Sequence, residues 1–430
     1  MSSANRLFIA SDRAAGPAGL NRLGRVLGGA ALALGLWVTA LAGAPNPAGA
    51  APAAEPAGLR SQVQSALDDY LRRYGKAEHI SGLSAFISRR DGDPGIIATA
   101  GTTRWRGRGE PITADTLFQI GSNTKAFTSV MLLKLEADGL LDIDDAIGKY
   151  LPQYPAWKSV SIRRLLNMTS GLPTYSEAPK FMKHQAADPD RHYTLDQLVA
   201  YAYPSKGNDL PGNKGWFYSN TNYVLGGMIV ETLRKQAYED VIRKEIFRPF
   251  GLNRTHYADR QLPSRVLDQA AGGYFDNPAC SLYTPDCKVG QLTPLVGLNL
   301  QRADLSWAGP AGGIVSTPRD LTSWIRHLFA GRVLPPKQMR ELLTLVSSKT
   351  GKPIDRATAQ DPRAFALGLA QMYDPTMGRF WFYEGETLGY RAVFAYYPED
   401  DLVVTVFLNS QPAEDHIVEL MSALYAIFTK

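Results

Sequence analysis

The stretch "YRAVFAYYPEDDLVVTVFLNS", residues 390–410, decides the fold. Two runs rich in β-branched and aromatic residues flank the turn-forming segment "PEDD", a pattern typical of a β-hairpin. Just upstream, "FALGLAQMY" (365–373) and "GRFWFYEGE" (378–386) predict two more strands, and a last helix is expected over roughly 414–428. The C-terminal part of the chain therefore predicts an antiparallel sheet closed by a helix.

The other end of the chain predicts elements that complete this sheet. Apolar residues at helical spacing in "LRSQVQSALDDYLRRYG" (59–75) indicate a helix, and "GLSAFISRRDGDPGIIATAG" (82–101) reads as a hairpin with Asp-Gly and Pro-Gly turns. The region between, roughly 115–335, is mostly helical in pattern, and strands do not alternate with helices. We expect an α+β fold, an α/β sandwich: one antiparallel sheet from both chain ends, flanked by helices, in a single domain over 59–430.

The first 50 residues have the pattern of an export signal. Four arginines against one aspartate give this segment +3 of the net charge of +5. The apolar run "VLGGAALALGLWVTALAGA" (26–44) follows, and then Ala48-Gly49-Ala50 as a cleavage site. We expect a signal peptide over 1–50, a Pro/Ala linker over 51–58 and a periplasmic or secreted protein. The alternative is an uncleaved membrane anchor, since a run of about 19 residues is long enough to span a bilayer.

The net charge and the cysteine content limit the kinds of partner and cofactor that we expect. The residues after the first 50 have a net charge of about +2, which is too small to indicate a nucleic-acid partner. The two cysteines, Cys280 and Cys287, are expected to form a disulfide outside the cytoplasm, with two free thiols as the alternative. The six histidines are scattered along the chain, so neither a metal nor another cofactor is expected.

The segment "FQIGSNTKAFTSVMLLKLEADG" (118–139) contains Ser122 and Lys125, the only Ser-x-x-Lys pair in the chain. The pair begins a helix that is apolar on nearly every face and therefore buried. A serine at a helix N-terminus lies where developing negative charge is favoured. Lys125 lies one turn on, on the same face, and burial would lower its pKa until it takes the serine proton. The pattern is that of a nucleophile and its base, and the alternative is that two common residues share a helix by chance.

A second segment, "WFYSNTNYVLGGMIVE" (216–231), contains the only Tyr-x-Asn of the chain, again before an apolar helix. Tyr218 near a lysine is expected as a phenolate that shuttles protons to a leaving group. Asn220 is expected to orient the lysine and a substrate carbonyl. The simpler interpretation is a helix cap beside an aromatic residue, but the first pair favours the catalytic interpretation.

These segments together resemble the serine β-lactamase and penicillin-binding protein family, in its branch of class C β-lactamases and D-alanyl-D-alanine carboxypeptidases. The resemblance runs from about residue 60 to the C-terminus and includes "LLNMTSGLP" and "GPAGGIVSTPRDL". It implies a β-lactamase-like fold and acyl transfer. In that chemistry Ser122 attacks an amide or ester, Lys125 and Tyr218 share the base and acid roles, and Asn220 positions the substrate.

The third element of this family, Lys-Thr-Gly or His-x-Gly on a strand facing the serine, is altered. Lys349-Thr350-Gly351 matches the Lys-Thr-Gly motif, but it lies in a polar, turn-rich segment after which no strand is expected. The order of the motifs along the chain instead identifies Tyr383-Glu384-Gly385-Glu386 as the third element. The main-chain N–H of Glu386 would then complete an oxyanion hole with the N–H of Ser122. Tyr383 would replace the cation, and two carboxylates beside the site would repel a substrate carboxylate.

The altered element favours a neutral ester or amide, or a substrate with a free amine, over a β-lactam. Candidate substrates are acyl esters, D-amino-acid amides, peptidoglycan-type peptides and β-lactams. Two alternatives stay open: a class C-like β-lactamase, and a non-catalytic receptor for cell-wall fragments or penicillin. An α/β-hydrolase is disfavoured because the chain has no Gly-x-Ser-x-Gly motif.

Overall fold

The computed structural model describes residues 57–205, 210, 212–258, 262–277 and 291–429. The predicted signal peptide and the residues Cys280 and Cys287 lie outside this part of the chain. Helix α2 (Ala57–Tyr74) begins before the predicted boundary and includes residues 57 and 58, the last two residues of the predicted linker. Among the described helices, none is long and apolar enough to cross a membrane.

A nine-stranded antiparallel sheet organises the molecule, in the order β2-β1-β13-β12-β11-β10-β9-β7-β8. Its strands are β1 (Gly82–Ser88), β2 (Ile96–Gly101), β7 (Leu345–Ser347), β8 (Pro353–Ile354), β9 (Arg363–Phe365), β10 (Ala370–Asp374), β11 (Gly378–Thr387), β12 (Tyr390–Tyr397) and β13 (Leu402–Leu408). The N-terminal hairpin joins the C-terminal strands where β1 pairs with β13, from Leu83 opposite Leu408 to Ser88 opposite Val403. The predicted α+β fold with one sheet from both chain ends is confirmed.

The segment "FALGLAQMY" is not one strand, as the sequence predicted, but parts of two. β9 ends at Phe365 and β10 begins at Ala370, and both pair with each other. Gly368 turns the chain between them at a φ of +82°, and a side chain there would stand 2.8 Å from the carbonyl oxygen of Lys125. The tight turn lets this part of the sheet pack directly on the helix that carries Lys125.

The region 115–335 is mostly helical, as predicted. Its helices are α3 (Thr124–Ala137), α4 (Ile162–Leu166), α5 (Pro179–Ala187), α6 (Leu195–Ala200), α7 (Asn220–Arg234), α8 (Tyr238–Ile242), α9 (Ser264–Leu267), α10 (Gly309–Gly312) and α11 (Pro318–Phe329), and α12 (Pro336–Leu342) follows. The region also contains a small sheet of β3 (Phe118–Gln119), β6 (Ile314–Ser316) and β4 (His256–Tyr257), which the sequence analysis did not predict. A parallel pair joins β5 (Tyr274–Asp276) to β14 (Ser410–Pro412).

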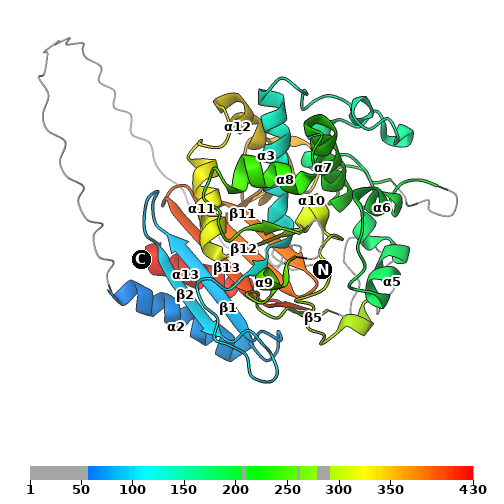
Figure 1. Ribbon diagram of the computed structural model, residues 1–430. Coiled ribbons are helices and arrows are strands. Elements are labelled where there is room, and N and C mark those ends of the chain that lie inside the picture. The colour runs from blue at the N-terminus through cyan, green and yellow to red at the C-terminus, as the bar shows by residue number, and fades with distance from the viewer. Residues whose placement is uncertain (1–56, 206–209, 211, 259–261, 278–290, 430) are drawn as a thin grey trace, which may run out of the picture.

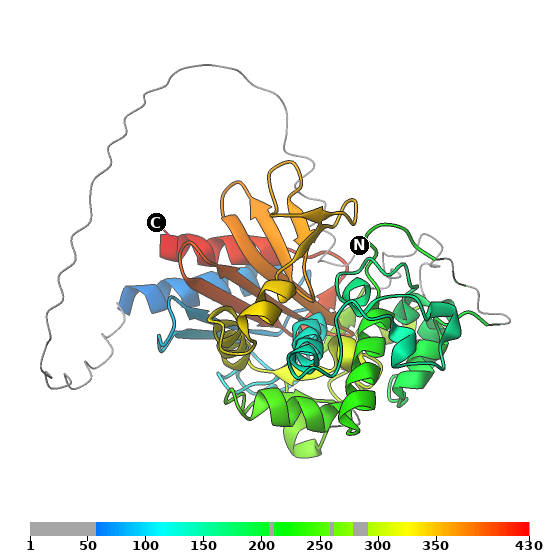
Figure 2. The same cartoon turned by 90° about the horizontal axis from the view of Figure 1, so that it is seen from above.

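The large sheet separates two hydrophobic cores. α2 and the C-terminal helix α13 (Ile417–Thr429) cover one face, and the helical region covers the other (Figures 1 and 2). Side chains alternate along β11: Phe380 and Phe382 join the core under α2 and α13, whereas Trp381 and Tyr383 join the core on the helical side. This period of two decides which residues of the third motif face the serine.

Candidate active site

Ser122 lies in a short 3₁₀ turn, η2 (Gly121–Asn123), which leads directly into α3. The side-chain amide of Asn123 fixes this turn, because Nδ2 donates to the carbonyl oxygens of Ile120 at 2.9 Å and Ala392 at 2.8 Å. The second bond ties the turn to β12. The Ser122 side chain is half-buried, so its hydroxyl stands at the start of a buried helix and remains accessible.

Lys125 is fully buried, one helical turn after the serine. Its Nζ lies 2.8 Å from Ser122 Oγ, 2.8 Å from Asn220 Oδ1 and 2.8 Å from the carbonyl oxygen of Ala311. Burial lowers the pKa of Lys125 well below its usual range. A neutral amine has two N–H groups and one lone pair, and the amide and carbonyl oxygens can only accept. In the neutral form that burial favours, the lone pair is thus left for the Ser122 hydroxyl, as a base requires.

Tyr218 is the second group on the serine. Its hydroxyl donates to Ser122 Oγ at 2.7 Å and accepts a hydrogen bond from the Tyr383 hydroxyl at 3.2 Å. Part of the ring is exposed, but burial around the hydroxyl raises the pKa of Tyr218 to about 12. The expectation of a phenolate is wrong for this reason. Near neutral pH Tyr218 is a phenol, which suits it to donate a proton.

Asn220 begins α7, which positions both its amide and the preceding Tyr218. Its Oδ1 accepts from Lys125, and its Nδ2 lies 2.9 Å from the Oγ of Ser176. The Asn220 main-chain N–H donates to Thr174 Oγ1 at 3.0 Å. The sequence analysis assigned no role to Thr174, Ser176 or Ala311. No local signal marked the first two, and Ala311 contributes a main-chain carbonyl from the segment "GPAGG".

Two residues of the third motif face the serine. The Tyr383 hydroxyl donates to the Tyr218 hydroxyl, which contacts Ser122, and Gly385 packs against the turn that contains Ser122. A Cβ on Gly385 would stand 1.9 Å from the carbonyl oxygen of Ile120 and 2.8 Å from the main-chain N of Ser122, so only glycine fits. β10 pairs with β11 from Gly378 to Phe382, and the motif lies on the stretch of β11 after that pairing ends. The oxyanion hole of Ser122 and Glu386 N–H groups stays a prediction.

Glu384 and Glu386 do not place their side chains beside the serine, contrary to the prediction. They alternate with Tyr383 and Gly385 on β11, and their partners across the strand pair are Val393 and Arg391. Val393 belongs to the core under α2 and α13, so both carboxylates point to that side of the sheet. Burial, together with the charge of Asp415, raises the pKa of Glu384 well above its usual range. The predicted repulsion of a substrate carboxylate is therefore wrong for Glu384, whereas the charge of Glu386 still acts on the Tyr218 hydroxyl and its effect on a substrate stays a prediction.

Lys349, Thr350 and Gly351 form the turn between β7 and β8, so a short strand does follow them, contrary to expectation. Gly351 packs against the main chain of Gly215 and Trp216. The strand that faces Ser122 is β11, as the order of motifs predicted.

Comparisons with known proteins agree with this geometry. The sequence model described as Beta-lactamase matches residues 67–426. Penicillin-binding protein 4* of Bacillus subtilis (strain 168) is 27% identical over 318 residues, which is 73% of this chain and 65% of that protein. The chain thus spans less than two thirds of the length of this curated relative.

Solved structures with the same fold include two amidohydrolases. The D-amino acid amidase from Ochrobactrum anthropi SV3, in complex with D-phenylalanine, has a TM-score of 0.70 and 25% identity, over 87% of this chain and 100% of that one. A D-stereospecific amidohydrolase from Streptomyces sp. has a TM-score of 0.67 and 25% identity, over 85% of this chain and 98% of that one.

Proposed function

The chain belongs to the Beta-lactamase family and is a serine hydrolase, and on that premise we propose that it hydrolyses an amide or ester through an acyl-enzyme on Ser122. One observation carries the proposal: Ser122 Oγ lies 2.8 Å from the Nζ of a buried lysine and 2.7 Å from the hydroxyl of Tyr218. These two groups supply a base for the attacking hydroxyl and an acid for the leaving group.

Acylation starts with the neutral amine of Lys125. Nζ takes the proton of the Ser122 hydroxyl while Oγ forms a bond to the substrate carbonyl carbon. Asn220 Oδ1 and the Ala311 carbonyl oxygen accept from the amine, and they stabilise the ammonium that forms. The N–H groups of Ser122 and Glu386 would hold the oxyanion. The C–N or C–O bond then breaks, and the leaving group takes a proton from the Tyr218 hydroxyl.

Deacylation uses the same groups in reverse. Water attacks the acyl carbon and gives up a proton to the Tyr218–Lys125 pair, and Oγ leaves and regains its proton. The net reaction consumes one water and releases an acid and an amine or alcohol. Tyr383, which donates to Tyr218, is a positioning residue that keeps the phenol directed at Ser122.

We propose D-amino-acid amides or esters as the substrate class. Tyr383 puts a neutral hydroxyl where the family's third motif has a cation, which favours a substrate without a carboxylate at this point. Aromatic rings lie beside Tyr383 on this side of the site. The ring centroids of Trp216 and Phe365 are 5.6 Å apart, and those of Phe365 and Tyr383 are 6.0 Å apart. Two structural neighbours, a D-stereospecific amidohydrolase and a D-amino acid amidase, support the same substrate class by their names.

Export and a Cys280–Cys287 disulfide are also part of the proposal, and the sequence pattern alone supports them. Two activities are alternatives to the proposed one: a class C-like β-lactamase and a non-catalytic penicillin receptor. The aromatic rings beside Tyr383 and its neutral hydroxyl favour the amidase or esterase over the β-lactamase, and the complete proton-transfer set favours it over the non-catalytic receptor.

The test treats the purified mature chain with D-phenylalanine amide, L-phenylalanine amide and benzylpenicillin, and follows intact mass and product release. A Ser122→Ala variant is the matched control. We expect turnover of the D-amide, slower turnover of the L-amide, and no reaction in the variant. Fast hydrolysis of benzylpenicillin would identify a β-lactamase instead. A long-lived adduct without turnover would identify a penicillin receptor, and equal turnover by Ser122→Ala would refute the acyl-enzyme.

A further inference from the structure

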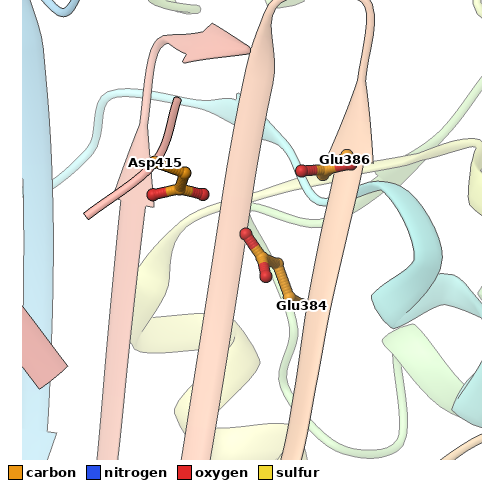
Figure 3. A group of neighbouring side chains, drawn as sticks. All are labelled: Glu384, Glu386 and Asp415. Atoms are coloured by element: carbon orange, nitrogen blue, oxygen red, sulfur yellow. The ribbon is translucent and has the colours of Figure 1, made fainter. Parts of the chain in front are cut away.

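Three carboxylates gather behind the third motif, on the face of the sheet away from Ser122. Glu384 and Glu386 come from β11, and Asp415 comes from the segment just before α13 (Figure 3). Each offers an oxygen, and these oxygens lie within 4.8 Å of one another. The cluster plays no part in the acyl transfer derived above.

Several of these oxygens are buried without a donor. Glu384 is 3% exposed, and neither of its carboxylate oxygens receives a hydrogen bond from an N–H or O–H group in the described part of the chain. Its close polar contact is with another carboxyl group, that of Asp415. Asp415 Oδ2 is likewise buried and receives no such bond from the described residues. Buried carboxylate oxygens of this kind are stabilised either by a proton shared between the carboxyl groups or by a bound cation.

The nearby arginine does not fill this need. The Arg391 guanidinium donates to Glu78 at 2.8 Å and to the carbonyl oxygen of Ser410 at 2.9 Å, and its Nη1 forms an ion pair with Asp415 Oδ1 at 2.5 Å. Glu78 also accepts from Tyr70 and from His416. One guanidinium thus faces two carboxylate partners, and neither carboxylate oxygen of Glu384 receives one of its hydrogen bonds.

We propose that Glu384, Glu386 and Asp415 bind a hard divalent cation, with Ca²⁺ as the best fit. The ligands are carboxylate oxygens alone, the donor set that Ca²⁺ and Mg²⁺ prefer over softer metals. Ca²⁺ accepts irregular sets of about 6–8 oxygen ligands, which suits three carboxylates that come from a strand and a loop. Mg²⁺ fits less well because it prefers regular octahedral geometry with shorter bonds.

The site would connect to catalysis through the backbone of β11. Glu384 and Glu386 flank Gly385, which packs directly on the Ser122 turn. A cation behind the strand fixes these two side chains and links β11 to the start of α13. We therefore expect bound Ca²⁺ to raise thermal stability first, and to change the catalytic rate only modestly.

The experiment uses the full mature chain after treatment with a chelator and dialysis. Titration with CaCl₂ is followed by isothermal calorimetry and by thermal unfolding, with MgCl₂ in a parallel series. We expect one Ca²⁺ per chain and a rise in Tm of about 2 °C or more at about 1 mM CaCl₂. Glu384→Gln and, separately, Glu386→Gln should abolish both signals. Glu399→Gln, an exposed carboxylate in the turn before β13, should leave them intact.

Three results would overturn the proposal. No heat of binding and no Tm shift in the unchanged chain would show that the Glu384 and Asp415 carboxyls share only a proton. A Ca²⁺ response that persists in both glutamine variants would place the site elsewhere. Equal loss in Glu399→Gln would show a nonspecific charge effect. Because neither readout uses a substrate, the outcome is independent of the proposed hydrolase activity.

Discussion

Replacing Asn220 by aspartate tests whether Lys125 is a neutral base. The change puts a carboxylate oxygen where the amide oxygen now lies, 2.8 Å from Nζ. Opposite unit charges at that distance attract by about 6 kcal/mol at an effective dielectric constant of about 20. Desolvation of the half-buried carboxylate offsets roughly half of this attraction. About 3 kcal/mol remains, which raises the pKa of Lys125 by about 2 units.

The sign of the effect on rate follows from the role of the lysine. Activity requires the neutral amine, so kcat/KM falls as pH drops below the pKa of Lys125 in the folded enzyme. Asn220→Asp should move this acidic limb to higher pH by about 2 units and lower kcat/KM about 100-fold at pH values below the limb. The assay is the pH–rate profile of the Asn220→Asp enzyme on the substrate that the wild type turns over, with D-phenylalanine amide tried first.

Asn220→Ala is the matched control, because it removes the same hydrogen bond without adding a charge. It should lower the rate but leave the acidic limb at or below its original pH. If Asn220→Asp and the wild type have superimposable profiles, Lys125 is already an ammonium and the neutral-base reasoning is refuted. An upward shift of equal size in Asn220→Ala would trace the effect to the lost amide and refute the electrostatic argument.

Three further predictions follow from single contacts. Tyr383→Phe should lower kcat/KM about 3- to 10-fold, the value of one hydrogen bond to the Tyr218 hydroxyl, and steady-state kinetics would show a much larger loss if Tyr383 touched the reacting atoms. Gly385→Ala should reduce activity at least about 100-fold and lower Tm, because its Cβ would stand 1.9 Å from a main-chain carbonyl oxygen; full activity would disprove that close approach. Arg391→Met should cost about 3–5 kcal/mol in urea unfolding because it removes the guanidinium from two buried carboxylates, whereas the exposed Arg73→Met should cost less than about 1 kcal/mol, and similar values for both would contradict the burial argument.

Local patterns were sufficient for most elements and for one pair of candidate catalytic residues. The hairpins followed from turn residues and alternating apolar residues, and the pairing of β1 with β13 agrees with them. Ser122 and Lys125 were predictable because a spacing of three on a helix fixes their distance. The single strand expected over 365–373 failed because the turn at Gly368 depends on α3, a distant element.

The remaining features of the site depend on contacts between distant segments. Asn220 meets Lys125 across 95 positions of the chain, and the carbonyl oxygen of Ala311 meets it across 186. Burial by these neighbours, rather than residue type, lowers the pKa of Lys125 and keeps Tyr218 a phenol. No local pattern in the sequence predicts that desolvation.

The sequence by itself determined the fold class, the order of the motifs and the close approach of Ser122 to Lys125, because periodicity and short spacings act within one element. Only the tertiary structure decided on which side of the sheet the Glu384 and Glu386 carboxylates lie. The physical reason is that side chains alternate along a strand, so a register set by β12 and by the packing of Gly385 on the serine turn assigns each residue its face.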